Sequence, residues 1–168
     1  MSKYGEAVER LARFYQFLES KSLQIPRKEI TGKIGEWMVM EELIQRGHTP
    51  TFKAGQHGVD IILSDGRGVE VKSAIFNDGK SAWLFDGIKQ EKFDYLVCVK
   101  LADDYSEVEY FVFTSEEAGQ IPYRTANSNE RRLKVYDDIS RIRSDGMRDI
   151  NEKLEEFHEA WQKLPPTE

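Results

Sequence analysis

The most restrictive feature of this 168-residue sequence is a pair of short β-branched segments separated by a turn. Residues 59–63 read Val-Asp-Ile-Ile-Leu, and residues 69–75 alternate apolar and polar side chains in the run Val-Glu-Val-Lys-Ser-Ala-Ile. Branched residues and a period of two are typical of strands. The intervening Ser-Asp-Gly-Arg-Gly has the composition of a turn. The two segments are therefore predicted to form a β-hairpin.

Two helices are predicted before this hairpin. In residues 4–20 the apolar side chains recur at spacings of three and four, which gives one apolar stripe. Residues 28–46 carry apolar side chains around much of the helix circumference, so this second helix is predicted to be well buried. Gly47 follows it and is expected to end it.

The chain after the hairpin is predicted to alternate between strands and helices. Residues 94–101 and 108–114 are expected to be strands, with a short helix over residues 86–91 before them. Residues 122–134 are polar and irregular. The apolar residues from Ile150 to Leu164 recur at helical spacing, which predicts helices near the C-terminal end.

The order of these elements predicts an α/β fold with a mixed sheet and helices on both faces. A chain of 168 residues is long enough for a core of its own, so residues 1–168 are expected to form one domain. The helix at 4–20 and the helices at about 136–164 are expected to lie outside the central core. Their apolar stripes could pair within one chain, which is the simpler expectation, or join two chains as a homodimer.

Composition narrows the class of protein. No apolar run is long enough to cross a bilayer, and the first residues lack the apolar stretch of a signal peptide, so a cytoplasmic protein is expected. The single cysteine, Cys98, lies in an apolar strand, where cysteine packs as a small apolar residue. An intrachain disulfide is impossible, and a cysteine-based zinc site is not expected.

The charge of the chain argues against a nucleic-acid partner. The formal net charge is −6 and the isoelectric point is about 5.3, whereas phosphate binding usually leaves a basic footprint. Basic residues nevertheless gather at Arg27 and Lys28, at Lys33 and in segment 124–134. A carboxylate-rich active site also makes a chain more acidic than its binding surface. From charge alone, a solvated surface is the simpler interpretation of these clusters.

The chemistry of the hairpin depends on three residues. Glu70 and Lys72 are two apart on a strand, so they project from one face, and Asp60 on the partner strand can approach Glu70. Two neighbouring carboxylates repel unless a positive charge lies between them. Magnesium takes oxygen ligands from one or two carboxylates and leaves the rest to water and phosphate. A lysine beside it can hold or deprotonate a water or neutralise charge on phosphorus oxygens.

This pattern resembles the active-site hairpin of the PD-(D/E)xK nuclease superfamily. The resemblance rests on Gly-Val-Asp at residues 58–60 and Val-Glu-Val-Lys-Ser at residues 69–73. Many members place a glutamate on the preceding helix, which Gly-Lys-Ile-Gly-Glu at residues 32–36 resembles. Residues 89–90, Lys-Gln, resemble the helix that follows. The resemblance covers about residues 28–120, and the superfamily includes restriction enzymes, Holliday-junction resolvases of archaea and repair nucleases.

The resemblance implies a restriction-endonuclease-like fold and metal-dependent hydrolysis of DNA phosphodiester bonds. The implied cofactor is Mg²⁺, for which Mn²⁺ can substitute. Asp60, Glu70 and the carbonyl of Val71 would bind the metal, and Lys72 would position or activate the water. Glu36 would orient a water or a second metal. RNA is an alternative substrate.

Further candidate residues follow from the same resemblance. Some branches use a glutamine after the hairpin, which makes Gln90 a catalytic candidate. One departure is Val59, which stands where many members have proline. For His57, a contact with solvent or phosphate is expected rather than metal binding. Contacts with nucleic acid are predicted for Lys33, Lys53, His57, Arg67 and Ser73.

Each of these interpretations has a structural alternative. An acid-x-Lys triplet alone predicts little, since Asp78-Gly79-Lys80 is another and has the composition of a turn. Glu36 could form a salt bridge, and Glu41 is an equally unusual acid on an apolar flank of the same helix. The alternative function is a nuclease-fold module that binds DNA or a protein with little or no catalysis. The joint pattern of helix glutamate and hairpin favours the nuclease.

Overall fold

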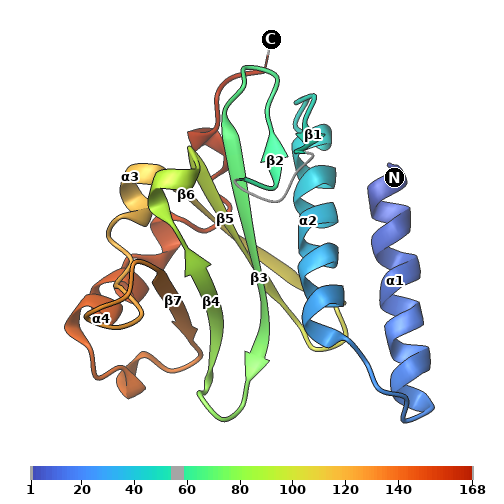
Figure 1. Cartoon of the computed structure of the whole chain (residues 1–168), viewed down its shortest axis with the longest axis horizontal. Coiled ribbons are helices and arrows are strands. Elements are labelled where there is room, and N and C mark those ends of the chain that lie inside the picture. The colour runs from blue at the N-terminus through green and yellow to red at the C-terminus, as the bar shows by residue number, and fades with distance from the viewer. Residues whose placement is uncertain (1, 54–58, 168) are drawn as a thin grey trace.

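The fold was analysed on a computed structural model that describes residues 2–53 and 59–167. Helices α1 (Lys3–Ser20) and α2 (Arg27–Gln45) lie on one side of a seven-stranded sheet, with α1 outermost (Figure 1). The smaller helices α3 (Ser115–Ala118) and α4 (Asp145–Glu152) lie on the other side. Helices therefore flank both faces of a mixed sheet, as the element order predicts.

Strand β3 (Gly68–Asn77) is the centre of the sheet. It runs antiparallel to β2 and parallel to β5, and β5 runs antiparallel to β6. Strand β4 pairs with β3 only at Phe76 and Asn77 and then pairs along its length with β7. The other strands are β1 (Thr51–Phe52), β2 (Ile61–Ile62), β4 (Ala82–Ile88), β5 (Tyr95–Leu101), β6 (Val108–Thr114) and β7 (Arg131–Tyr136).

The alternation along β3 and β5 produces two apolar clusters, one on each face of the sheet. Val69, Val71 and Val97 pack with α1 and α2 on one face. Ala74 and Cys98 point to the opposite face and pack with residues of β4, β7 and α4. Both faces of the central strands are covered, so the strand pattern keeps its apolar positions buried. Cys98 is a buried free thiol, as expected.

The predicted N-terminal helices and the hairpin are confirmed. The Gly47 φ of +88° and its N–H bond to the Ile44 carbonyl end α2, as expected. Ile61 pairs with Val69 across the hairpin. The stripe of α1 packs within the chain, and association of two chains through the terminal helices stays a prediction. Within the described residues, no helix is both long and apolar enough to traverse a lipid bilayer.

The helix predicted over residues 86–91 is wrong, because this segment continues strand β4 into the 3₁₀ turn η1 (Gln90–Lys92). The register with β7 shifts between Phe85 and Ile88, and Gly87 has a φ of +69°. An extra residue at such a bulge interrupts the period of two, which concealed the strand in the sequence.

The irregular segment predicted at 122–134 is also partly wrong, because strand β7 starts at Arg131. Leu133 and Val135 are buried and alternate with Arg132 and Lys134, a short strand pattern that the surrounding polar residues obscured. The long polar side chains at the alternate positions extend their charged ends toward solvent, so they do not disturb the pairing of β7 with β4.

The predicted C-terminal helices are confirmed only over α4, since the segment after Glu152 forms irregular chain with short 3₁₀ turns. Tertiary hydrogen bonds explain this difference: the Val112 N–H donates to the Phe157 carbonyl at 2.8 Å, and the Glu159 N–H donates to the Tyr110 carbonyl at 2.9 Å. The apolar residues remain buried against β6 although the backbone is not helical. The turns in this segment are η3 (Leu154–Glu156) and η4 (Trp161–Lys163), and a further 3₁₀ turn, η2 (Ile139–Arg141), precedes α4.

Candidate active site

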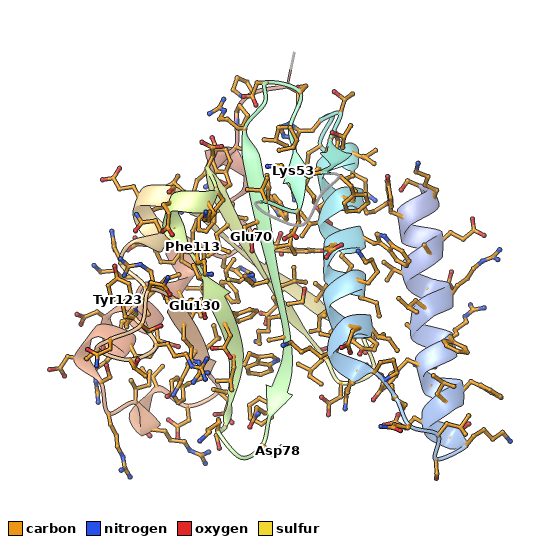
Figure 2. The ribbon with its side chains drawn as sticks, in the orientation of Figure 1. Lys53, Glu70, Asp78, Phe113, Tyr123 and Glu130 are labelled. Carbon is orange, nitrogen blue, oxygen red and sulfur yellow. The ribbon has the colours of Figure 1, made fainter. Side chains whose placement is uncertain are left out.

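Glu70 and Lys72 project from one face of β3 and form an ion pair. Lys72 Nζ lies 2.6 Å from Glu70 Oε1, and the exposed fractions of the two side chains are 25% and 13%. Glu70 Oε2 is buried and has no hydrogen-bond partner among the described residues. Figure 2 shows Glu70 on the central part of β3, with Lys53 on the side of β1 and β2. One carboxylate oxygen is therefore satisfied by an ammonium group, and the other has no partner within residues 2–53 and 59–167.

The electrostatic environment of Glu70 does not fully compensate its charge. Burial raises the pKa of the Glu70 carboxyl, and the negative charges of Asp60 and Glu36 act in the same direction. The Lys72 ammonium opposes the shift in pKa but does not cancel it. A further cation beside Glu70 would stabilise the ionised carboxylate.

Asp60 is brought to Glu70 by the register of the hairpin. Ile61 pairs with Val69, so the residue before Ile61 lies across from the residue after Val69. Asp60 donates its N–H to the Val69 carbonyl at 3.1 Å, and its Oδ2 accepts the Val71 N–H at 2.8 Å. Because the N–H and C=O of a strand residue point to the same edge, the Val71 carbonyl also faces the side of Asp60.

Helix α2 supplies the third carboxylate near Glu70. Glu36 is half-buried, with 23% of its side chain exposed, and forms an ion pair with Lys33 one turn earlier. Its charge contributes to the raised pKa of Glu70, which brings the helix glutamate into the same electrostatic site. Lys33 also lies 5.8 Å from the centre of the Phe52 ring.

Glu41, the other unusual acid of α2, has a structural role. It accepts hydrogen bonds from the backbone N–H of Ser2 and Gly5 at 3.2 and 3.1 Å, and from the Ser2 hydroxyl. Burial opposes ionisation, but these hydrogen bonds outweigh it and lower the pKa of Glu41 to about 2. Glu41 therefore holds the start of α1, whereas the charge of Glu36 acts on Glu70.

A glycine lets α2 approach β3. A Cβ atom on Gly35 would lie 1.7 Å from Ser73 Oγ and 2.8 Å from Ser73 Cβ. Ser73 Oγ is buried under the helix and has no hydrogen-bond partner among the described residues. This hydroxyl faces α2, whereas the predicted role was a contact with nucleic acid.

Two further candidates form structural hydrogen bonds away from Glu70 and Lys72. The Gln90 side chain donates to the Ser115 carbonyl at 2.8 Å and packs against Gly119, at the start and end of α3. Arg67 is held in the hairpin turn, where it donates to Asp65 at 2.6 Å and to the Tyr95 hydroxyl at 2.7 Å.

The remaining candidates lie near the hairpin. Lys53 is exposed after β1, and its N–H donates to the Asp60 carbonyl at 3.1 Å, so it is adjacent to Asp60. His57 lies outside the described residues. The structure thus brings together Asp60, Glu70, Lys72 and Glu36.

The donors at this site suit a hard divalent cation that retains water. Across the described residues, no three His, Cys, Asp or Glu side chains are close enough to hold a metal ion on their own. Two carboxylates and a strand carbonyl remain as donors, all of them oxygen atoms. Mg²⁺ accepts such a partial set when water and phosphate supply the other ligands. Glu70 Oε2, which is buried and lacks a partner among the residues that the structure describes, fits this requirement.

A cleft of about 740 Å³ opens beside Lys72. Its walls are formed by β3, by β4, by the start of α2 and by residues near β7. Five basic residues against two acidic ones give it a formal charge of +3, although the chain as a whole is acidic. The basic residues are Arg27, Lys28, Lys72, Arg124 and Arg132, and the acidic ones are Asp86 and Glu130.

The sequence contains only a partial signal for this cleft. The basic clusters at Arg27 and Lys28 and in segment 124–134 are visible, but their approach to Lys72 depends on the pairing of β4 with β7. Gly87 lies at the bulge of β4, and a Cβ there would be 3.9 Å from Lys72 Nζ. The missed strand β4 is thus the element that places this wall beside the lysine.

The chain has the fold of a known nuclease. It is similar to the structure of a bacterial homing endonuclease, I-Ssp6803I, with a TM-score of 0.56 and 14% sequence identity. The similarity covers 80% of this chain and 90% of that chain. No protein-family model and no curated protein matches the sequence. At this identity the comparison shows the shared fold, and it confirms the predicted α/β architecture.

Proposed function

We propose that this chain is a divalent-metal-dependent endonuclease of the PD-(D/E)xK type that hydrolyses DNA phosphodiester bonds. The observation that carries the proposal concerns Glu70: its Oε2 is buried and has no hydrogen-bond partner in the part of the chain that the structure describes, while Lys72 pairs with Oε1. Asp60 faces Glu70 across the hairpin and contributes to its raised pKa. The fold shared with a homing endonuclease supports a nuclease in general.

Asp60, Glu70 and the Val71 carbonyl are the residues that would hold Mg²⁺, with Mn²⁺ as a substitute. When bound, the metal would polarise the phosphate and lower the pKa of a bound water. Asp60 is oriented for this role because its Oδ2 is fixed by the Val71 N–H at 2.8 Å. Glu36 would orient water from the side of α2, and Lys33 would hold its carboxylate in place.

Lys72 would act on the water and on the phosphate. Its ammonium lies against Glu70 in a half-buried position, where two charges interact more strongly than in bulk water. It would position the water that attacks phosphorus and neutralise the charge that develops on the non-bridging oxygens. The water oxygen would form a bond to phosphorus while the P–O bond to the leaving sugar oxygen breaks. The attacking water would give up a proton to solvent, and the leaving oxygen would take one up from solvent.

Cleavage assays test the proposal directly. Plasmid, linear and branched DNA and an RNA of matched sequence are incubated with Mg²⁺, with Mn²⁺ or with EDTA. We expect DNA cleavage with either metal, none with EDTA and none with Glu70→Gln, whereas the matched control Glu6→Gln, an exposed glutamate on α1, keeps full activity. Cleavage in EDTA, or equal cleavage by Glu70→Gln, would contradict the proposal.

The same assay separates the other candidate functions. DNA binding without cleavage in both metals would indicate the alternative, a nuclease-fold binding module. Cleavage of the RNA alone would agree with the proposed metal site but would show that the substrate is RNA and not DNA. The positive charge of the cleft favours a nucleic-acid ligand over an acidic protein partner, because phosphates are spaced regularly along a strand.

A further inference from the structure

We propose that the cleft beside Lys72 holds one strand of DNA by its phosphates, with Arg124 and Arg132 as contacts, and that Asp86 competes with phosphate for Arg132. This inference rests on the proposed function, since it names the form of the substrate that reaches the site. It depends on the size of the cleft, on its charge and on one ion pair within it.

The size of the cleft limits what can enter. Its volume of about 740 Å³ falls among clefts of roughly 300–1,000 Å³, which enclose a ligand of drug size. A short piece of one strand fits this space. A duplex, whose grooves alone are about 12 and 6 Å wide, can rest only on the rim. Val71 and Lys72 line the cleft, so a strand inside it would reach two residues of the proposed site.

The charges of the cleft lie on two opposed elements. Arg27 and Lys28 begin α2, whose first turn has no side-chain cap, so the positive end of the helix dipole adds to their charge. Arg27 is held by the Asp103 carbonyl at 2.9 Å and by the Tyr15 ring. Arg124 and Arg132 lie near β7. Phosphates between these groups would be contacted from both sides.

The two arginines near β7 differ in how they are held. Arg124 is exposed, and no ion pair is found for it within residues 2–53 and 59–167. Its backbone N–H donates to the Glu130 carbonyl at 2.9 Å, which fixes the loop that carries it. Figure 2 shows Glu130 on the β4 side of β3. Arg124 could therefore bind a phosphate without breaking an ion pair to any of the described residues.

Arg132 is engaged by an acid of the same cleft. Its Nε forms an ion pair with Asp86 of β4, and the exposed fractions of the two side chains are 23% and 46%. A phosphate that binds Arg132 must compete with this carboxylate. Removal of the Asp86 charge should therefore strengthen binding, which a purely structural ion pair would not do.

The test is the binding of a short labelled single-stranded DNA and of its duplex, measured by fluorescence anisotropy in EDTA over a series of salt concentrations. EDTA prevents cleavage, so a failure of the proposed activity leaves this measurement intact. Each phosphate contact on a single strand contributes about 0.7 to the slope of log affinity against log salt. We expect Arg124→Ala and Arg132→Ala to weaken single-strand binding severalfold and to lower the slope by about this amount.

Two further variants show whether weaker binding comes from a lost phosphate contact or from loss of the folded structure. Asp86→Asn should tighten single-strand binding, and Arg10→Ala, an exposed arginine of α1 outside the cleft, should leave it unchanged. The duplex should bind less tightly than the single strand. The inference is overturned if Arg124→Ala has the affinity of the parent protein, if Asp86→Asn weakens binding, or if the duplex binds more tightly than the single strand.

Discussion

Asp60 Oδ2 accepts the backbone N–H of Val71 at 2.8 Å, so one carboxylate both extends the β2–β3 pairing and faces Glu70. Asp60 N–H donates to the Val69 carbonyl in the same hairpin. The residue is thus anchored at its backbone and at one oxygen. A side chain held in this way loses little conformational entropy when its charge is used to bind a cation.

The anchoring of Asp60 leads to a prediction that separates charge from structure. Asp60→Asn keeps an oxygen that can accept the Val71 N–H but removes the charge, so we expect near-normal thermal stability and a loss of activity of about 100-fold or more. Asp60→Ala should lose activity and also stability, by about 1 kcal/mol, because the Val71 N–H loses its acceptor. Thermal unfolding and metal-dependent cleavage measure the two effects. Full activity of Asp60→Asn would remove Asp60 from the site.

Lys72 is expected to act in turnover more than in metal binding. Lys72→Met keeps most of the side-chain volume and removes the ammonium, so cleavage should fall by about 100-fold or more. Mn²⁺ binding, measured by calorimetry, should remain or strengthen, because Glu70 Oε1 is released from its ion pair. The matched control is Lys3→Met on α1, which should leave both quantities unchanged. Equal cleavage by Lys72→Met would exclude Lys72 from the mechanism.

The raised pKa of Glu70 predicts how metal-free stability depends on pH. A carboxyl whose pKa is higher in the folded than in the unfolded protein favours folding below the unfolded value, and this stabilisation is lost as pH rises through the folded value. Glu70→Gln should therefore unfold at a higher temperature than the parent at neutral pH, and the difference should vanish at acidic pH. Thermal unfolding in EDTA across this range measures the effect. A lower melting temperature of Glu70→Gln at neutral pH would contradict it.

The same shift predicts how metal binding depends on pH. Protonation of Glu70 competes with the cation, so the rise in melting temperature caused by Mg²⁺ should grow as pH increases through the raised pKa of Glu70. Glu70→Gln should show little rise at any pH. A rise that is independent of pH in the parent protein would place the cation elsewhere.

The parts of the site that the sequence predicts are those set by local geometry. Glu70 and Lys72 share a face because side chains alternate along any strand, and Asp60 meets Glu70 because a tight turn fixes the hairpin register. The helix that carries Glu36 is equally local, since its apolar positions define it. These features depend on residues close together in the chain, so periodicity and turn composition are sufficient to place them.

The parts that could not be predicted depend on contacts distant in the chain. The bulge at Gly87 breaks the alternation of β4, and the pairing with β7 brings together Arg132 and Asp86, which are 46 residues apart in the chain. The role of Glu41 becomes visible only when α1 docks its first residues on α2. The negative net charge of the whole chain also conceals a cleft whose lining is positively charged. Tertiary packing decides each of these features.

The close approach of α2 to β3 at Gly35 gives a prediction with a control on the same helix. A Cβ on Gly35 would overlap Ser73 Oγ, so Gly35→Ala must push α2 from β3 and should destabilise the protein by about 1–3 kcal/mol. No atom of the described residues lies within 4 Å of a Cβ on Gly32, where alanine should stabilise by up to about 1 kcal/mol through helix propensity.

The double variant shows whether the clash itself is the cause. Ser73→Gly removes both Ser73 atoms that a Cβ at position 35 would overlap, so it should recover part of the stability lost in Gly35→Ala. Displacement of α2 would also move Glu36 from Glu70, and cleavage should fall in Gly35→Ala and partly return in the double variant. Chemical denaturation and cleavage assays measure both effects. If Gly35→Ala and Gly32→Ala have the same stability, α2 and β3 are not close enough at this point for a Cβ to clash.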